Sequence, residues 1–110
     1  SAVMQDTNPK DVIIAINDNA QDGIDISWLW DVDFDRLGEE SIRSITVSGI
    51  RCQDMRLRLK YVDIPSILES DVEKAIRDRV ADGTGNLYVL VNYTALFSTR
   101  NILKKLEGEH

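Results

Sequence analysis

The run Val12-Ile13-Ile14-Ala15-Ile16 decides the fold of this chain of 110 residues. It is continuously apolar and has polar or charged residues on both sides. This pattern is typical of a strand that is buried on both faces of a parallel sheet. A second run of this kind covers residues 87–91 and predicts a second central strand. We therefore expect these two strands to be the most buried strands of the sheet.

The rest of the chain alternates between the patterns of strands and helices. We expect further strands at residues 41–48 and 66–69, and helices at residues 52–62, 70–81 and 95–106. Ser70-Asp71-Val72-Glu73 has the spacing of a capping box, and Thr94 is placed to cap the last helix. Such alternation predicts an α/β domain with a four-stranded, mostly parallel sheet, right-handed crossovers and three main helices.

The composition limits which classes of partner and which cellular compartment we expect. The 19 acidic residues exceed the 13 basic ones, and the formal net charge is -6. Nucleic acids and anionic membrane surfaces bind clusters of Lys and Arg, so we expect neither as a partner, and a basic protein surface fits better. No apolar run approaches the roughly 20 residues of a membrane span, so we expect no membrane insertion. The single cysteine, Cys52, excludes an internal disulfide and is compatible with a cytoplasmic location.

The length indicates one domain. Residues 1–9 are polar and end in Asn8-Pro9, a pairing that disfavours helix and predicts a linker. Ser1-Ala2 looks like a remnant of tag removal. We expect the domain itself to occupy residues 10–110, with His110 in the tail.

The stretch from Asn17 to Asp31 differs from the rest of the chain, which has the character of a scaffold. It follows the first buried strand and contains turn-forming residues, four carboxylates and both tryptophans of the chain. Two further aspartates follow at positions 33 and 35. A polar loop at the carboxyl end of a buried strand is the usual place for a ligand site in an open α/β sheet.

Three interpretations of these aspartates remain open. Calcium prefers carboxylate oxygens, but the spacing lacks the glycine and the closing glutamate of an EF-hand loop, so we expect no metal site. The stretch can instead be a solvated acidic loop that is built on Asx turns. In the third interpretation one aspartate orients the histidine of a catalytic triad. The nucleophile would then lie elsewhere, because Cys52 has no histidine to pair with except His110.

Trp28 and Trp30 share one side of the chain if this piece is extended. Partly exposed tryptophans are favoured as anchors of protein interfaces, so both residues, with Asp31, are candidates for contact with a partner. The alternative is that one or both tryptophans cover the sheet as part of the core.

Ser48-Gly49-Ile50-Arg51 has the character of a strand-to-helix turn. Its amide groups and the Arg51 guanidinium are suited to receive an anion together. We therefore predict substrate or anion contacts at Asn17, Ser48 and Arg51. We expect this turn to lie between the loop that follows the first strand and residues 92–94 after the last strand.

The motif Asp22-Gly23-Ile24-Asp25-Ile26-Ser27-Trp28-Leu29-Trp30-Asp31 resembles the C-terminal domain of the MurT family, the Mur-ligase-like subunits of lipid II isoglutaminyl synthases. The likeness continues through Ser48-Gly49-Ile50-Arg51 and Leu87-Tyr88-Val89-Leu90, and it spans about residues 12–106. It implies a small three-layer domain similar to the dinucleotide-fold-like C-terminal domain of Mur ligases.

The resemblance also implies an activity for the full-length protein. Such a subunit is a cytoplasmic enzyme of peptidoglycan precursor synthesis, which uses ATP and Mg²⁺ to activate the D-glutamate α-carboxylate of the lipid II stem peptide. A GatD-type glutaminase subunit supplies ammonia, and the product is D-isoglutamine. The present sequence has no Gly-x-x-x-x-Gly-Lys-Ser/Thr phosphate loop, so we expect ATP in a central ATPase domain outside this chain. We expect the isolated domain to be inactive.

The family implies one more role, in which an aspartate of this domain completes the Cys-His pair of the partner glutaminase. Asp22 is the first candidate, because an Asp-Gly turn presents its carboxylate outward, and Asp25 and Asp18 follow in that order. The alternative function, from a different class, is a non-catalytic interaction module that uses the acidic, tryptophan-containing loop.

Overall fold

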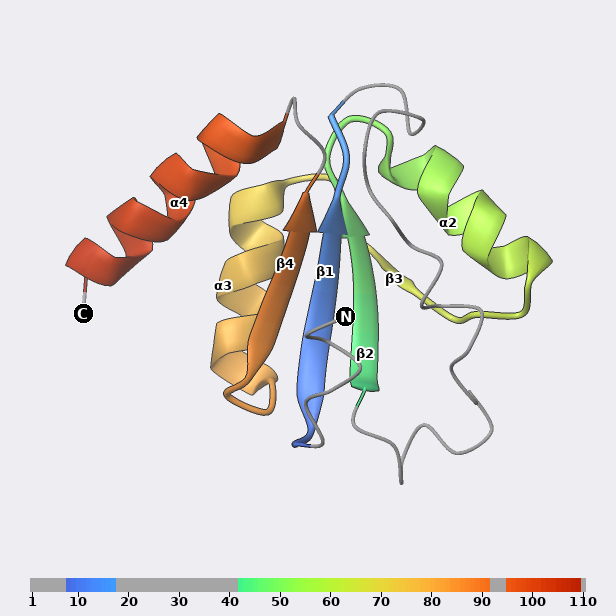
Figure 1. The fold of residues 1–110 in the computed structure, drawn as a ribbon, viewed down its shortest axis with the longest axis horizontal. Helices are drawn as coiled ribbons and strands as arrows, with labels where there is room; N and C mark the ends of the chain where they lie inside the picture. Colours follow the sequence, from blue (N-terminus) through green and yellow to red (C-terminus); the bar gives the residue numbers. More distant parts are fainter. Residues whose placement is uncertain (1–7, 18–41, 92–94, 110) are drawn as a thin grey trace.

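The computed structural model describes residues 8–17, 42–91 and 95–109. These residues form an all-parallel sheet of four strands in the order β3-β2-β1-β4, with three helices (Figure 1). The strands are β1 (Lys10–Ala15), β2 (Ile42–Ser48), β3 (Ile67–Leu68) and β4 (Leu87–Val91). The helices are α2 (Cys52–Tyr61), α3 (Val72–Asp82) and α4 (Leu96–Gly108). The predicted α/β class, the parallel sheet and the three helices are confirmed.

β1 lies inside the sheet and pairs in parallel with β2 on one side and β4 on the other. All side chains of residues 12–16 are completely buried. They alternate between the faces, so that Val12, Ile14 and Ile16 pack with residues of α2, whereas Ile13 packs with residues of α3. A helical layer therefore covers each face of the sheet, as predicted for a three-layer domain.

The expectation that residues 87–91 form a second central strand is wrong. β4 is the outermost strand next to β1, and all of its side chains are only half-buried. The other inner strand is β2, most of which is buried. Tyr88 and Leu90 pack on the α2 side of the sheet, and Leu87 and Val89 pack on the α3 side. The apolar run of β4 thus reflects the fact that both faces of this strand are covered. Such a run does not tell whether the strand has a neighbouring strand on each side.

α3 begins with a different cap from the predicted box. Its N-cap is Asp71, whose carboxylate accepts a hydrogen bond from the Lys74 N–H at 3.3 Å. Ser70 instead lies in the preceding segment, where its carbonyl accepts the Gly49 N–H at 3.0 Å. Glu73 forms ion pairs with cations of α3 and α4. The predicted helix is therefore present, but its first turn is capped one residue later.

α4 packs beside α3 through Ile102 and Leu106, which lie against the buried cluster on that face. An exposed ion pair between Lys105 and Glu73, at 3.1 Å, also links the two helices. Exposed pairs of this kind contribute at most about 1 kcal/mol, so apolar contacts hold α4 in place. The predicted cap of this helix, Thr94, lies outside the described residues.

Asp11 joins three chain segments at the amino end of the sheet. Its carboxylate accepts hydrogen bonds from Arg43 Nη1 at 2.9 Å, Ser44 Oγ at 2.5 Å and the Thr84 N–H at 2.8 Å. The side chain is 1% exposed. Burial alone would raise the pKa of Asp11, but the hydrogen bonds from Ser44, Thr84 and Arg43 outweigh it and hold the pKa below the ordinary 3.8. The sequence patterns do not indicate this role, because nothing local distinguishes Asp11 from an exposed aspartate.

The turn between β2 and α2 is held against the end of β1. The Ile16 N–H donates to the Ser48 carbonyl at 3.0 Å, and the Ile16 carbonyl accepts the Arg51 N–H at 2.9 Å. Gly49 has a φ of +89°, and a Cβ atom there would lie 2.5 Å from the Ile16 carbonyl oxygen. This close approach of two backbones therefore requires glycine.

Replacing Asp11 with Ala should lower the free energy of unfolding by about 3 kcal/mol, because it removes a charged acceptor and leaves its donors without a partner. Urea denaturation at neutral pH measures this loss. The matched control is Asp82→Ala, an exposed carboxylate at the end of α3, with an expected change within about 0.5 kcal/mol. Equal losses in the two variants would contradict the role assigned to Asp11.

The Asp11 contribution should also depend on pH. The pKa of Asp11 is lower in the folded than in the unfolded state, so its stabilisation is complete above the unfolded value near 3.8 and is lost as pH falls through the folded value. The difference in unfolding free energy between the unmodified chain and Asp11→Ala should be constant from neutral pH down to 3.8 and shrink below it. A difference that shrinks already near neutral pH would contradict this assignment.

Gly49→Ala should destabilise the chain much more than Gly85→Ala. Both glycines have φ near +90°, but a Cβ at Gly85 meets nothing within 4 Å. Gly85→Ala should therefore lower the free energy of unfolding only by the conformational penalty of about 1 kcal/mol. Gly49→Ala must also displace the Ile16 backbone, so we expect a loss of at least about 3 kcal/mol. Thermal or urea unfolding of the two variants makes the comparison, and similar losses would disprove the close approach.

Candidate functional site

The strand order places the candidate site at the carboxyl ends of β1 and β4. From β1 the order continues to β2 and β3 on one side, and α3 then carries the chain back across the sheet to β4 on the other side of β1. Ligands of open α/β sheets bind at the carboxyl ends of the strands, where the order reverses in this way. Both strands point in the same direction in Figure 1, and in the sequence residues 18–41 come after β1 and residues 92–94 come after β4.

The turn from Ser48 to Arg51 does not lie where the sequence suggested. Because β1 pairs with both β2 and β4, the end of β1 lies between this turn and the end of β4. The expectation that the turn separates the other two strand exits is therefore wrong. The carboxyl end of β1 instead lies next to the turn on one side and next to the end of β4 on the other.

Asn17 contacts the turn directly. Its side-chain oxygen, Oδ1, accepts the Ile50 N–H at 3.3 Å. The Gly49 N–H donates to Ser70, and the Arg51 N–H donates to Ile16. The three amide groups from Gly49 to Arg51 are thus engaged within the fold, and an anion at this turn would have to rely on a side chain.

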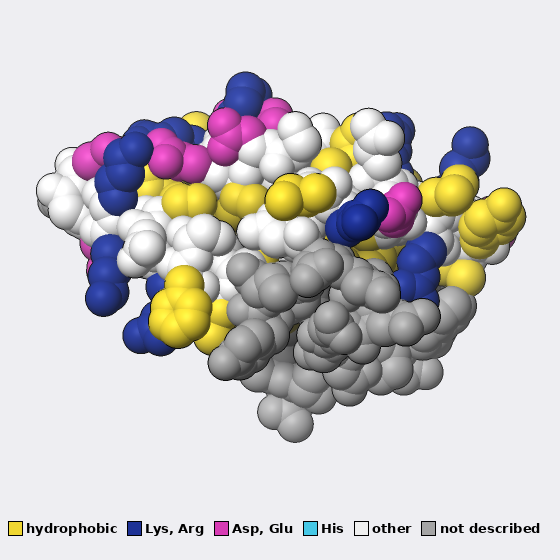
Figure 2. All heavy atoms as spheres, turned by 90° about the horizontal axis from the view of Figure 1, so that it is seen from above, with side chains coloured by type: hydrophobic (Ala, Val, Ile, Leu, Met, Phe, Trp, Pro, Cys, Tyr) yellow, Lys and Arg dark blue, Asp and Glu magenta, His cyan; other side chains and the backbone are white. Residues whose placement is uncertain are grey.

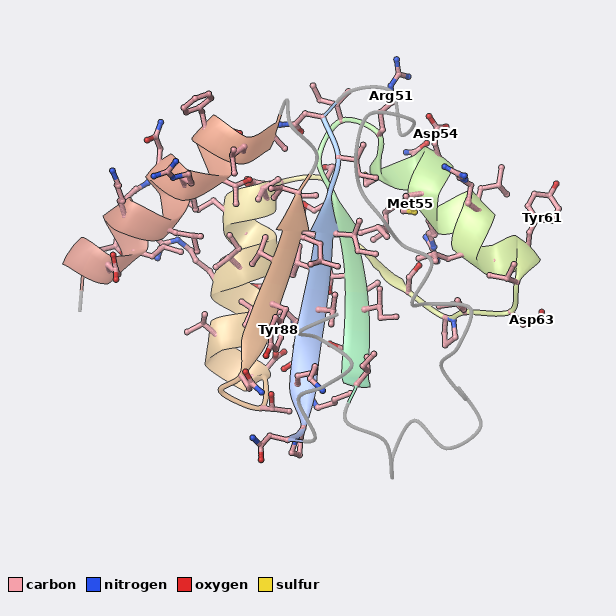
Figure 3. All side chains as sticks on the ribbon, viewed as in Figure 1. Arg51, Asp54, Met55, Tyr61, Asp63 and Tyr88 are labelled. Carbon is pink, nitrogen blue, oxygen red and sulfur yellow. The ribbon has the colours of Figure 1, made fainter. Side chains whose placement is uncertain are left out.

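Ser48 and Arg51 differ in exposure. Ser48 is completely buried, and its hydroxyl has no hydrogen-bond partner among the described residues. The Arg51 side chain is 52% exposed and points away from the sheet (Figure 3), with Nη1 3.9 Å from the Asp54 carboxylate. A pocket of about 430 Å³ adjoins Arg51 at the start of α2. Of these two residues, only Arg51 presents a charged group to solvent. Anion contact at Asn17, Ser48 and Arg51 stays a prediction.

Cys52 also lines this pocket, but its thiol is unsuited to nucleophilic chemistry. The residue is 3% exposed and packs with Met55 and Leu59 in the cluster beneath α2. Burial raises the pKa of the Cys52 thiol above its ordinary value. Because the thiolate is the reactive form, this cysteine is a packed core residue, in agreement with its place in the helical pattern.

The remaining predicted site residues lie outside the described residues. They comprise the candidates for the catalytic and interface roles, Asp18, Asp22, Asp25, Trp28, Trp30 and Asp31. The structure describes the two ends of the segment that carries them: it leaves β1 at the carboxyl edge and returns at Ile42, the first residue of β2. The two strands are parallel, so the segment connects the carboxyl end of β1 to the amino end of β2.

Figure 2 views the carboxyl edge from above, and in its described part Lys and Arg side chains lie among Asp and Glu side chains. Within the described ranges, no group of three or more His, Cys, Asp or Glu residues is arranged to hold a metal ion. The same part of the chain contains no helix whose length and apolar character would suffice to cross a bilayer.

Comparison with known proteins identifies relatives of this chain. Residues 1–96 match the family described as MurT ligase C-terminal. The MurT subunit of lipid II isoglutaminyl synthase (glutamine-hydrolyzing) from Staphylococcus aureus is 42% identical over 89 residues, which cover 79% of this chain and 20% of that protein. The subunit of the same name from Streptococcus pneumoniae is 32% identical over 98 residues, which cover 86% of this chain and 22% of that protein.

The chain spans about a fifth of the length of these curated relatives. The family match covers both inner strands, the turn at Gly49 and the aspartate-rich stretch from Asn17 to Asp31. The resemblance that the aspartate and tryptophan motif suggested is thereby confirmed, and the chain belongs to the MurT ligase C-terminal family.

Proposed function

We propose that this chain is the C-terminal domain of the ligase subunit of a lipid II isoglutaminyl synthase. The observation that carries the proposal is its family membership, together with relatives that are named as MurT subunits of that glutamine-hydrolysing enzyme. The full-length protein would amidate the D-glutamate of the lipid II stem peptide to D-isoglutamine. A GatD-type glutamine amidotransferase would provide ammonia from glutamine, and both subunits would work in the cytoplasm.

ATP and Mg²⁺ belong to another part of the full-length protein in this proposal. The sequence lacks a phosphate loop, and the described residues hold no cluster suited to a metal ion. These residues therefore do not fit the nucleotide, which we assign to the central ATPase domain of the subunit. ATP supplies the activation of the D-glutamate carboxylate there. The isolated domain should have no ligase activity.

The role of this domain is to complete and position the glutaminase. A carboxylate that accepts the Nδ1–H of a catalytic histidine fixes its tautomer and stabilises the imidazolium that forms during the reaction. We propose Asp22 for this role because it begins an Asp-Gly turn, with Asp25 and then Asp18 as the next candidates. Trp28, Trp30 and Asp31 would contact the same partner.

Two features of the described structure support this assignment. The segment that carries the three aspartates leaves β1 where the strand order reverses, which is the common location of sites in this class of fold. The buried Cys52 offers no nucleophile, which agrees with a histidine and a nucleophile supplied from outside this chain. Arg51, half-exposed near this edge, is available to contact an anionic group of the substrate.

Asp22→Asn in the full-length subunit should strongly reduce glutamine hydrolysis in the complex. The amide keeps the shape of the side chain but offers the imidazole no negative charge, a change that lowers turnover by about 10⁴ in serine-protease triads. Amidation of lipid II should survive when free ammonia replaces glutamine, because the ligase chemistry is untouched. Binding of the glutaminase and of ATP should also be preserved.

Asp25→Asn and Asp18→Asn, assayed in parallel, serve as matched controls in the same segment. The variant that loses glutamine-dependent activity while it keeps ammonia-dependent activity identifies the orienting aspartate. Near-normal glutamine hydrolysis in all three variants would disprove the catalytic role and favour a non-catalytic docking surface. Loss of activity with both nitrogen sources would disprove the separation of the two chemistries.

A further inference from the structure

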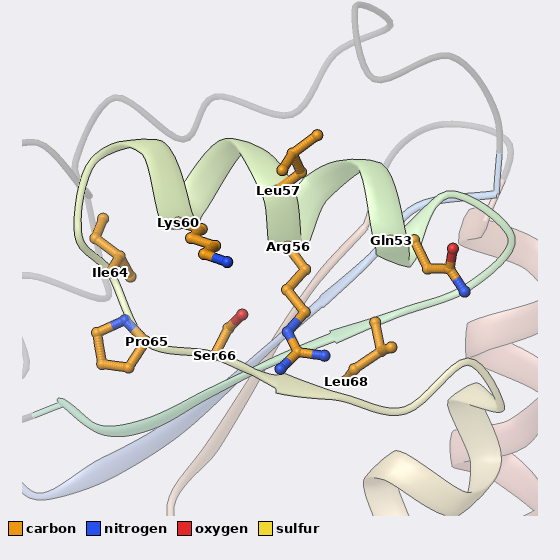
Figure 4. Close-up of a pocket in the computed structure, with 8 residues that line it drawn as sticks. All are labelled: Gln53, Arg56, Leu57, Lys60, Ile64, Pro65, Ser66 and Leu68. Carbon is orange, nitrogen blue, oxygen red and sulfur yellow. The ribbon is translucent and has the colours of Figure 1, made fainter.

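A groove of about 630 Å³ lies between α2 and β3, at the opposite side of the sheet from β4 (Figure 4). Residues of α2 line one wall, and the segment that leads into β3 lines the other. The lining residues are Gln53, Arg56, Leu57, Lys60, Ile64, Pro65, Ser66 and Leu68. The groove is separate from the strand exits at which the proposed function is located.

The wall on α2 is basic. Arg56 and Lys60 extend from the helix into the space beside β3 (Figure 4). Neither forms an ion pair with a described residue, and the only carboxylate of α2 is Asp54, in the first turn. By contrast, the cations of α3 are each paired with a carboxylate at 3.4 Å or less, namely Lys74, Arg77 and Arg79. The charge of the α2 wall is therefore not neutralised by the described part of the chain.

The opposite wall includes β3, which is an edge strand of the described sheet. Among the described strands it pairs with β2 alone, and the Glu69 N–H donates to the Val47 carbonyl of β2 at 3.0 Å. Amide groups alternate in direction along a strand, so the amide of Leu68 points away from β2, in the plane of the sheet. An edge of this kind can accept another strand. The neighbouring side chain of Ile67 lies on the other face of β3 and is 42% exposed.

We propose that this groove binds an extended acidic segment of a partner protein, which adds to the sheet as a further strand beside β3. Alternate side chains of an added strand point to opposite faces. Carboxylates on one side would reach Arg56 and Lys60, while apolar side chains on the other side would cover Ile67. Backbone hydrogen bonds to the edge contribute affinity, and the two cations select the charge of the segment.

The strand edge, rather than the charge, favours a peptide over an anionic bilayer. A bilayer surface would attract Arg56 and Lys60, but it has no backbone groups with which to satisfy the amide of Leu68. The proposal is also independent of the glutaminase role, because neither Arg56 nor Lys60 belongs to the segment of residues 18–41.

The probe is a short capped peptide in which aspartate alternates with valine, added to the full chain and followed by calorimetry and by NMR. We expect binding, slower hydrogen exchange of the Leu68 amide, and about tenfold weaker affinity in the double variant R56E/K60E, from the loss of two solvent-exposed ion pairs. The matched control is R100E/K104E, which reverses two exposed cations with the same spacing on α4. Its affinity should remain within about twofold of the unmodified chain.

Two further probes separate the alternatives. A peptide of alternating lysine and valine should not bind, and vesicles of phosphatidylglycerol and phosphatidylcholine in equal parts should not shift the Leu68 resonance. No binding of the acidic peptide would overturn the proposal and leave Arg56, Lys60 and Pro65 as groups that keep the edge from pairing. Binding without protection of Leu68, equal loss in both double variants, or preferential binding of vesicles would also overturn it.

Discussion

The parallel pairing of β1 with strands on both sides is the constraint on which the rest of the structure depends. Residues 12–16 are completely buried, so their backbone groups must find partners in the sheet rather than in water. Parallel partners require crossover connections, and α2 and α3 provide two of them on opposite faces. Since α3 must span from β3 to β4, the strand order reverses at β1. The carboxyl end of β1 consequently lies at the reversal of the strand order, where ligand sites of open α/β sheets are usually found.

Much of this architecture could be predicted from the sequence, because periodicity reports which faces are covered. Met55 and Leu59 lie at helical spacing and are both buried, and the bounds of α2 agree with the pattern within one residue. The edge position of β4 could not be predicted in the same way. Its apolar run looks like that of β1, since both have covered faces, and only the path of α3 decides which strand stays at the edge.

The candidate site was predictable in residue type but less so in geometry. The sequence indicates that Ser48 and Arg51 belong to one turn, and they do. It does not reveal that the amide groups of this turn are engaged by Asn17, Ile16 and Ser70, because these contacts join distant segments. Asp11 illustrates the same limit, since the donors to its carboxylate come from β2 and from the loop before β4.

Local charge, rather than net charge, determines which partners each surface of this chain can receive. A net charge of -6 suggests a basic partner for the chain as a whole. Residues 51–61, however, include four cationic side chains and only one carboxylate. Screening at physiological ionic strength limits the reach of an exposed charge to about 8 Å, whereas the described structure extends over 37 Å along its longest axis. The cations of α2 can therefore act on a nearby charged group of a partner, although the net charge of the whole chain is negative.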